Sequence, residues 1–211
     1  STLALILKEK GQPFEAENEI RKALMIKPDF GDAYLNLGLI LKSIGKSEEA
    51  ELATRKAIKL NPNSADGYLN LGNILQDQGK LKEAEEITRV AIDMRPEISD
   101  AHMNLGAILK DLGQLEEAII CAKRETDISP NKQAPYILLN SLLKECDLSD
   151  YSPDQLRIIL KKLLARNDIG HADLFRAIEK LMPSNLLLKL SESKGSIINT
   201  REFNFLISDN E

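Results

Sequence analysis

The chain has 211 residues, a formal net charge of −5, and only 4% aromatic residues. The acidic balance argues against nucleic acid and anionic membranes as partners, and no apolar run approaches the length that spans a bilayer. The two cysteines, Cys121 and Cys146, have neither metal-ligand spacing nor the density of a disulfide framework, which is typical of a reducing compartment and predicts a cytoplasmic location.

A 34-residue period runs through the first two thirds of the chain and is clearest in its prolines, Pro28, Pro62, Pro96 and Pro130. The same step separates the members of several other rows: Leu37, Leu71 and Leu105; Gly38, Gly72 and Gly106; Gly11, Gly45, Gly79 and Gly113; Ala16, Ala50, Ala84 and Ala118; Asn36, Asn70 and Asn104. Such a period indicates a stack of identical supersecondary units, which usually offers a binding surface rather than a reaction centre.

The first unit, residues 1–30, is predicted to be a truncated repeat. Ser1 falls at its fifth place, and the rest of the pattern is clear: Leu3, Leu7, Gly11, Ala16, Ile20, Ala23 and Pro28. We therefore expect the chain to be a fragment of a longer protein, cut within the first helix of this unit; a cut at the C-terminal end is an open alternative.

Residues 31–64 indicate how each unit folds. Apolar residues at helical spacing predict a first helix, which Gly45 ends in a left-handed conformation: Tyr34, Leu37, Leu41 and Ile44. A second helix is predicted to open after Ser47 as N-cap, with Glu48 and Glu49 in its first turn, and to stop at Asn61-Pro62. Its apolar face consists of Ala50, Ala53, Ala57, Ile58 and Leu60. Since one such hairpin cannot bury both its faces, neighbouring units must stack.

Small residues are predicted to let the two helices of a unit approach closely. Gly38 faces Ala50 in one unit, and Gly72 faces Ala84 in the next. Larger side chains there would push the helices apart, at a cost of about 1–3 kcal/mol.

These units resemble the tetratricopeptide repeat family, in which an aromatic, Leu-Gly, a bulky residue, Ala, an aromatic, Ala and Pro stand at fixed places. The places hold Tyr34, Leu37-Gly38, Leu41, Ala50, Thr54, Ala57 and Pro62 in residues 31–64; Tyr68, Leu71-Gly72, Leu75, Ala84, Thr88, Ala91 and Pro96 in residues 65–98; and His102, Leu105-Gly106, Leu109, Ala118, Ala122, Glu125 and Pro130 in residues 99–132. Thr54, Thr88 and Ala122 stand where the family has an aromatic residue, and Glu125 stands where it has Ala. The third unit, residues 99–132, therefore matches the family pattern least well. The resemblance covers residues 1–132 and implies an all-α fold, a right-handed superhelical array of antiparallel helix pairs.

Residues 133–182 are predicted to form a degenerate repeat and capping helices, because the last unit would otherwise expose an apolar face. Tyr136, Leu139 and Leu143 keep the register of a first helix, with Asn140 in place of the glycine. A helix over residues 153–166 is predicted to begin at Ser152-Pro153-Asp154, and another to follow Asp168. The first of these helices should turn inward Leu156, Ile159, Leu160, Leu163 and Leu164. Residues 183–211 form a C-terminal extension, in which residues 203–207 have β-like composition.

The resemblance implies that first helices line a concave groove, into which the second and sixth places of each unit project. The sixth place holds Asn36, Asn70 and Asn104, which look like the asparagine row of the O-linked N-acetylglucosamine transferases. A carboxamide offers two donors and an acceptor, so a row of them could hold a peptide backbone. Two alternatives stay open: Asn-Leu-Gly is common in this family, and the amides could serve hydrogen bonds between helices.

The second place holds Asp32, Asp66 and Asp100, which we expect in the first turns of their helices, where acids favourably oppose the helix dipole. They would also make the groove acidic and favour a basic or amide-rich ligand. The predicted peptide-binding residues are therefore the three asparagines, these three aspartates and Asn73.

The sequence predicts a scaffold that binds a protein or an extended peptide, with a basic partner favoured. It contains no P-loop, dinucleotide-binding glycine motif, HExxH or paired-cysteine motif, so no enzyme, catalytic residue, cofactor or metal is predicted. One alternative is a substrate-recruiting module of a larger modifying enzyme, such as a glycosyltransferase or methyltransferase. A second is self-assembly into a homodimer through an array end or residues 203–207.

Overall fold

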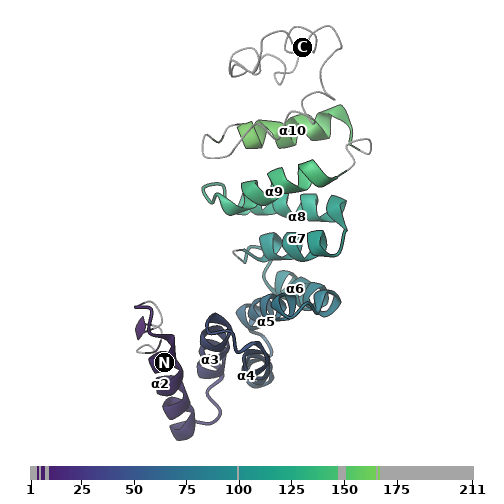
Figure 1. Ribbon diagram of the computed structural model, residues 1–211. Coiled ribbons are helices and arrows are strands. Elements are labelled where there is room, and N and C mark those ends of the chain that lie inside the picture. The colour runs from purple at the N-terminus through teal and green to yellow at the C-terminus, as the bar shows by residue number, and fades with distance from the viewer. Residues whose placement is uncertain are drawn as a thin grey trace, which may run out of the picture. The chain divides into compact units, whose positions relative to one another are not determined.

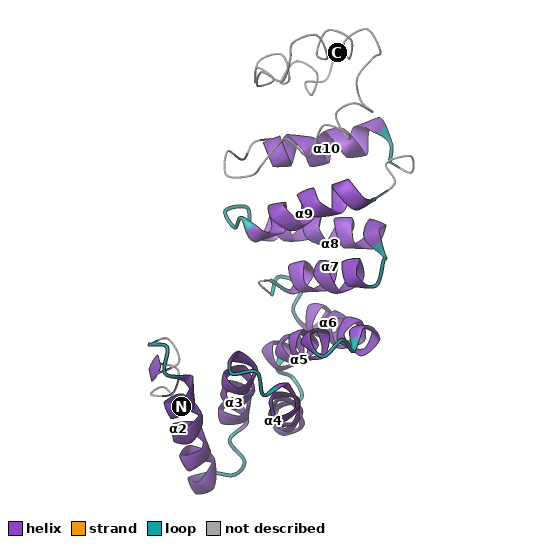
Figure 2. Cartoon of the chain, in the orientation of Figure 1, coloured by secondary structure: helices purple, strands orange, loops and turns teal. Residues whose placement is uncertain are grey.

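The computed structural model describes residues 4, 6–7, 10–98, 100–146, 151–164 and 166. Over these residues the chain is an all-α array of stacked antiparallel helix pairs, without strands (Figures 1 and 2). The all-α prediction is confirmed. The helix predicted after Asp168 and the β-like segment at 203–207 lie outside the described residues. The chain divides into two compact units, Ser1–Cys121 and Ala122–Glu211, and each is described by itself.

In the compact part Ser1–Cys121, successive helices contact one another in chain order. They are α2 (Pro13–Ile26), α3 (Gly31–Ser43), α4 (Ser47–Leu60), α5 (Ala65–Asp77), α6 (Leu81–Met94) and α7 (Ala101–Asp111), and α8 (Leu115–Ile128) begins in the same unit. Helix α5 also contacts both α3 and α7 directly. The first helices of the units, α3, α5 and α7, therefore lie side by side in one layer.

The first helices end as the sequence predicts. Gly45 and Gly79 adopt φ values of +78° and +73°, and a Cβ at either would meet nothing within 4 Å. The glycine is therefore required by the backbone and not by space. The next amides, Lys46 N and Lys80 N, each donate to the carbonyl five residues back at 2.9 Å, which closes a Schellman motif.

The second helices also end where predicted, but one start was wrong. Helices α4 and α6 stop at Leu60 and Met94, just before the cap residue and the proline of each unit. Ser47 is not the N-cap of α4. It is the first helical residue, and Lys46 precedes it as N-cap without a side-chain cap hydrogen bond. Helix α4 keeps the predicted Glu48 and Glu49 in its first turn, where they oppose the helix dipole.

The predicted close approach is confirmed in the repeats of residues 31–64 and 65–98. A Cβ at Gly72 would lie 2.2 Å from Thr88 Oγ1 and 3.4 Å from the Ala84 carbonyl oxygen. At Gly38 the equivalent distances to Thr54 and Ala50 are 2.2 and 3.3 Å. The threonines, which replace the family's aromatic residue, are themselves fully buried. A hydroxyl on the facing helix thus occupies the space that a methyl group on either glycine would need.

We expect Gly72→Ala to destabilise the array by about 1–3 kcal/mol, because the methyl group would overlap the Thr88 hydroxyl. In a Thr88→Ala background the same substitution should cost clearly less, since the nearest remaining contacts are of ordinary length. Urea denaturation of the wild type, both single variants and the double variant measures this coupling. An equal cost of Gly72→Ala in both backgrounds would show that Thr88 does not set the separation.

The core of the compact part Ser1–Cys121 follows the helical spacing of its leucines and isoleucines. Fully buried side chains recur one unit apart in the first helices, where they face the second helices and the next pair: Ile40, Leu41, Ile74, Leu75, Ile108 and Leu109. Each such aliphatic side chain stabilises the fold by about 1.5–3 kcal/mol on burial. Because every pair buries the same positions, the first helices keep a common register along the layer.

The compact part Ala122–Glu211 contains α9 (Ala134–Glu145) and α10 (Pro153–Leu164). Tyr136, Leu139 and Leu143 are buried as predicted, and Asn140 is buried beside them. Helix α10 begins at Pro153 and buries Leu156, Ile159, Leu160 and Leu163, also as predicted. Its start is a capping box, in which Gln155 N donates to Ser152 Oγ at 3.3 Å and Ser152 N donates to Gln155 Oε1 at 2.8 Å.

Candidate peptide-binding surface

The three predicted asparagines, Asn36, Asn70 and Asn104, form what we call the amide row. They occupy equivalent positions on α3, α5 and α7, and all three are half-buried. None of their side chains makes a hydrogen bond to any part of the chain that the structure describes. The alternative that they serve hydrogen bonds between helices is therefore not supported. Their donors and acceptors remain available to a ligand.

An apolar residue precedes each member of the amide row. Leu35 and Met103 are half-buried, and Leu69 is 8% exposed. Asn73, a further predicted binding residue, is half-buried on α5 and makes no hydrogen bond within the described residues. We call the exposed side of α3, α5 and α7, which carries the amide row and Asn73, the first-helix surface.

The aspartates predicted at the second place differ from one another. Asp32 and Asp66 lie in the first turns of α3 and α5, as predicted. The prediction was wrong for Asp100. This residue is the N-cap of α7, outside the helix, with φ of +69°. Helix α7 starts two places later in its unit than α5 does, so the third aspartate is not equivalent to the other two.

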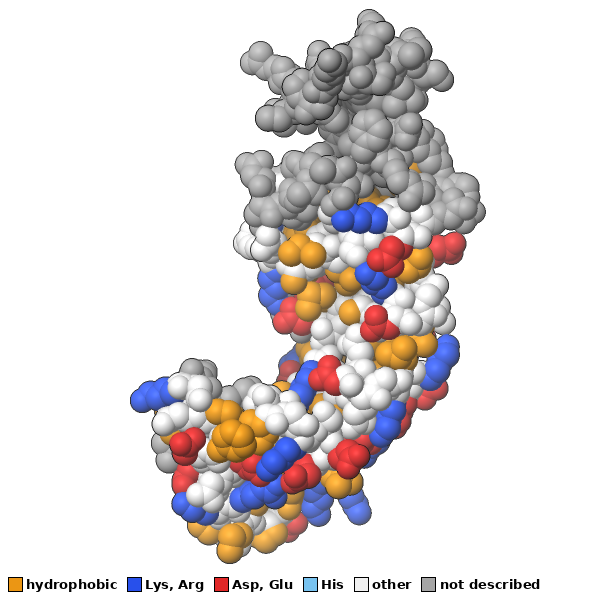
Figure 3. Space-filling view, viewed as in Figure 1, with side chains coloured by type: hydrophobic (Ala, Val, Ile, Leu, Met, Phe, Trp, Pro, Cys, Tyr) orange, Lys and Arg blue, Asp and Glu red, His pale blue; other side chains and the backbone are white. Residues whose placement is uncertain are grey.

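Acidic residues of the first helices are engaged by neighbouring side chains. Asp66 accepts from Arg95 at 2.5 Å, and Asp77 lies 3.2 Å from Lys42 Nζ. Asp111 accepts a hydrogen bond of 3.0 Å from Gln76. Figure 3 shows Lys and Arg side chains interspersed with Asp and Glu on the visible face, not gathered into a patch of one sign. Only part of the predicted acidic character is thus offered to a ligand.

His102 stands where the other units have tyrosine. Its Nε2 lies 3.2 Å from the carbonyl oxygen of Pro96, and Tyr136 donates to the equivalent carbonyl of Pro130 at the same distance. The two residues tie a helix to the turn that precedes it. His102 is therefore a packing residue.

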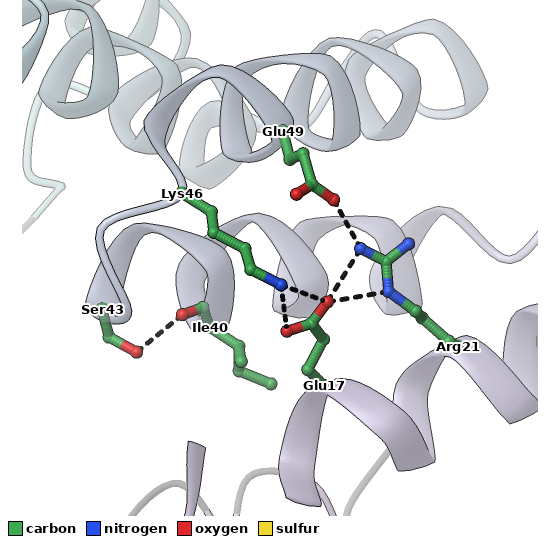
Figure 4. Close-up of polar contacts among 6 residues, drawn as sticks. All are labelled: Glu17, Arg21, Ile40, Ser43, Lys46 and Glu49. Carbon is green, nitrogen blue, oxygen red and sulfur yellow. Dashed lines mark hydrogen bonds and ion pairs between the residues drawn. The ribbon is translucent and has the colours of Figure 1, made fainter. Parts of the chain in front are cut away.

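A repeated ion-pair network, which the sequence analysis missed, links the second helices. In α2, Arg21 contacts Glu17 one turn back and Glu49 of α4 at 2.6 Å, while Lys46 reaches Glu17 at 3.0 Å (Figure 4). The same contacts recur one unit later with Arg55, Glu51, Glu83 and Lys80. Arg89 repeats them with Glu85 and with Glu117 of α8, at 3.1 and 2.7 Å. The sequence does contain arginines and glutamates that recur every 34 residues. They were not singled out because repeated charges on a helix usually mark only a solvent-exposed face.

The network lowers the pKa of the glutamates that it encloses. For Glu51, the hydrogen bond from Lys80 outweighs burial, which acts in the opposite direction, and Arg55 adds to the lowering. At Glu17, burial raises the pKa, but hydrogen bonds from Lys46 and Arg21 reverse that effect and leave it lowered. Both carboxylates are mostly covered, with side chains 15% and 11% exposed. These glutamates therefore stabilise the fold in their charged form.

We expect Glu51→Gln to lower the free energy of unfolding at neutral pH and to make that free energy depend less on pH in the acidic range. Because the folded pKa lies below the ordinary value of 4.5, the contribution of Glu51 is present above that value and is lost as the pH falls through the folded pKa. Denaturation of both proteins across acidic pH should therefore show their stabilities converging. Glu86→Gln is a matched control, because Glu86 is exposed on α6 and makes no ion pair within the described chain. A constant gap between wild type and Glu51→Gln at every pH would contradict the assignment.

Other kinds of site find no support in the part of the chain that the structure describes. It contains no cluster of three or more His, Cys, Asp or Glu side chains able to hold a metal ion. Cys121 and Cys146 are both buried and form no disulfide, and burial, with Glu117 nearby, raises the pKa of Cys121 to about 11. The Cys121 thiol is therefore not activated as a nucleophile. No helix among these residues is long and apolar enough to cross a membrane.

Comparison with known families identifies the repeat. Residues 31–64, 53–86 and 99–132 each match the tetratricopeptide repeat. The chain contains tetratricopeptide repeats over these residues. The predicted resemblance is thus confirmed, and domains of this family are generally protein-interaction scaffolds. No curated protein matches the sequence.

Solved structures share the fold over much of the chain. PilF of Pseudomonas aeruginosa is 20% identical, with a TM-score of 0.70 over 96% of this chain and 94% of that one. YrrB, described as a TPR protein with an unusual peptide-binding site, is 19% identical, with a TM-score of 0.58 over 90% and 89%. A mutant O-GlcNAc transferase of Thermobaculum terrenum is 26% identical, with a TM-score of 0.57 over 59% of this chain but 24% of its own.

Proposed function

We propose that this array binds an extended segment of a protein or peptide along the first-helix surface, through the amide row. The observation that carries the proposal is that Asn36, Asn70 and Asn104 recur at one position of three adjacent helices and have no hydrogen-bond partner among the described residues. A half-buried carboxamide that lacks a partner gains most from a ligand that supplies one. Since a carboxamide can bind the main chain, such a surface would tolerate many ligand side chains.

The surroundings of the amide row are consistent with this role. Leu35 and Met103 are half-buried and provide apolar area on two of the helices that carry the amides, and Asp32 is exposed without an ion pair in the described chain. Asp66 is held by Arg95, so it would meet a ligand only after exchanging that partner. A peptide-binding site named for YrrB, a protein of the same fold, further supports peptide binding as a use of such an array.

We expect the triple variant Asn36→Ala, Asn70→Ala, Asn104→Ala to lose peptide binding while keeping its helical content. Each amide should contribute about two- to tenfold to affinity, as single hydrogen bonds do. Peptides selected on the wild-type array from a random display library provide the ligands, fluorescence anisotropy measures binding, and circular dichroism checks the fold.

Asn18→Ala is the matched control, because Asn18 is an exposed asparagine on α2, away from the amide row. This variant should bind as the wild type does. Selected peptides that bind the triple variant with unchanged affinity would remove the amide row from the proposed function.

A second candidate is that the array recruits substrates for a modifying enzyme to which it belongs. The O-GlcNAc transferase favours it, because there a region similar to this array makes up only part of a larger enzyme. The full coding sequence tests this candidate: a catalytic domain in the same reading frame would support it, and its absence would leave a free-standing scaffold.

A further inference from the structure

We propose that the segment bound by the amide row is an uncharged polypeptide in the polyproline II conformation, with one residue in three facing each asparagine. This inference rests on the proposed function, since it assumes that the amide row binds a polypeptide backbone. It adds the conformation and the charge of the ligand.

The spacing of the first helices suits this conformation. Helices α3 and α5, and likewise α5 and α7, have residues whose Cα atoms lie within 8 Å of one another. Axes of packed helices are about 8–10 Å apart, and the proposal takes this value as the step between equivalent residues on neighbouring first helices. A polyproline II chain has three residues per turn and a rise of about 3.1 Å, so equivalent groups recur about every 9 Å on one side. In a β-strand they recur at about 7 or 13 Å, because alternate residues point to opposite faces.

Repeated contacts indicate that both steps are alike. Lys42 of α3 reaches Asp77 of α5 at 3.2 Å, and one unit later Gln76 of α5 reaches Asp111 of α7 at 3.0 Å. The two contacts join the same pair of positions in consecutive units. At these positions the step from α3 to α5 therefore matches the step from α5 to α7, and the amide row lies on the same three helices. A regular row of this kind matches a ligand that is itself regular.

The hydrogen-bonding chemistry agrees with the spacing. A polyproline II segment has no internal backbone hydrogen bonds, so its carbonyl oxygens are free to accept. Each asparagine can donate through its NH₂ group and needs no N–H from the ligand. Proline, which has a carbonyl but no N–H, can therefore occupy every position of the bound segment.

The charges on the first-helix surface favour an uncharged ligand over the basic one that the sequence suggested. Asp66 and Asp77 are paired with Arg95 and Lys42, which leaves no continuous row of unpaired carboxylates on α3 and α5. The half-buried side chains of Leu35 and Met103, on α3 and α7, offer apolar contacts for pyrrolidine rings. A ligand with many cations would have to compete with the existing pairs.

The test uses the full chain and a fluorescent peptide of Pro-Pro-Ala triplets. The peptide is roughly nine residues long, so that one triplet can face each of the three asparagines. Two peptides of equal length serve for comparison, one of Gly-Ser-Ala triplets and one in which Arg replaces the alanines. We expect the uncharged Pro-Pro-Ala peptide to bind at least about tenfold more tightly than the Gly-Ser-Ala peptide, because it is already ordered before binding. The Arg-containing peptide should gain no further affinity at physiological salt. The triple asparagine variant should weaken Pro-Pro-Ala binding about tenfold or more, and Asn18→Ala should not.

The outcomes separate this inference from the proposed function. If the Gly-Ser-Ala peptide binds equally well, or the Pro-Pro-Ala peptide does not bind, while display-selected peptides still depend on the amide row, the conformation is wrong and the proposed function stands. Preferential binding of the Arg-containing peptide would overturn the neutral character of the ligand. If no peptide, designed or selected, loses affinity in the triple variant, both proposals fail.

Discussion

The separation of the two helices within each unit governs the rest of this structure. A backbone without a side chain at Gly38 and Gly72 lies against a buried threonine and a carbonyl of the second helix, and a methyl group would not fit. This contact fixes how each pair packs, and the repeated pairs then bring α3, α5 and α7 into one layer. The positions of Asn36 and Asn70 therefore depend in part on two absent side chains on the opposite side of the same helices.

Neighbouring second helices are held together by different contacts from those that join neighbouring first helices. Second helices are joined by the arginine–glutamate network, in which carboxylates are mostly covered and hydrogen-bonded. Isolated pairs on a surface contribute about 0–1 kcal/mol, but a network that shares carboxylates and repeats in each unit holds successive helices in a defined register. First helices carry fewer such contacts, and the amide row lies on them. The structural ion pairs of the network and the amides of the proposed binding surface are therefore on separate helices.

Much of the fold could be predicted from the sequence because its determinants are local. Helix ends depend on a glycine such as Gly79 or a proline such as Pro62, and close packing depends on Gly72, so a periodic pattern reveals them. Non-local details could not be predicted in the same way. The partner of Asp66 is Arg95, 29 residues away, and the left-handed conformation of Asp100 arises where the third unit departs from the others. Whether the amide row binds a ligand depends on a second molecule that the sequence does not contain.

The turn glycines have one more consequence. Gly79 holds a mirror-image backbone conformation in open space, and Gly45 does the same one unit earlier. A D-alanine at either position would fit that conformation without strain and would restrict the unfolded chain, a combination that stabilises proteins by about 0.4–1 kcal/mol per site. Chemical synthesis could therefore strengthen the array at its hairpin tips, leaving both helical layers and their side chains untouched.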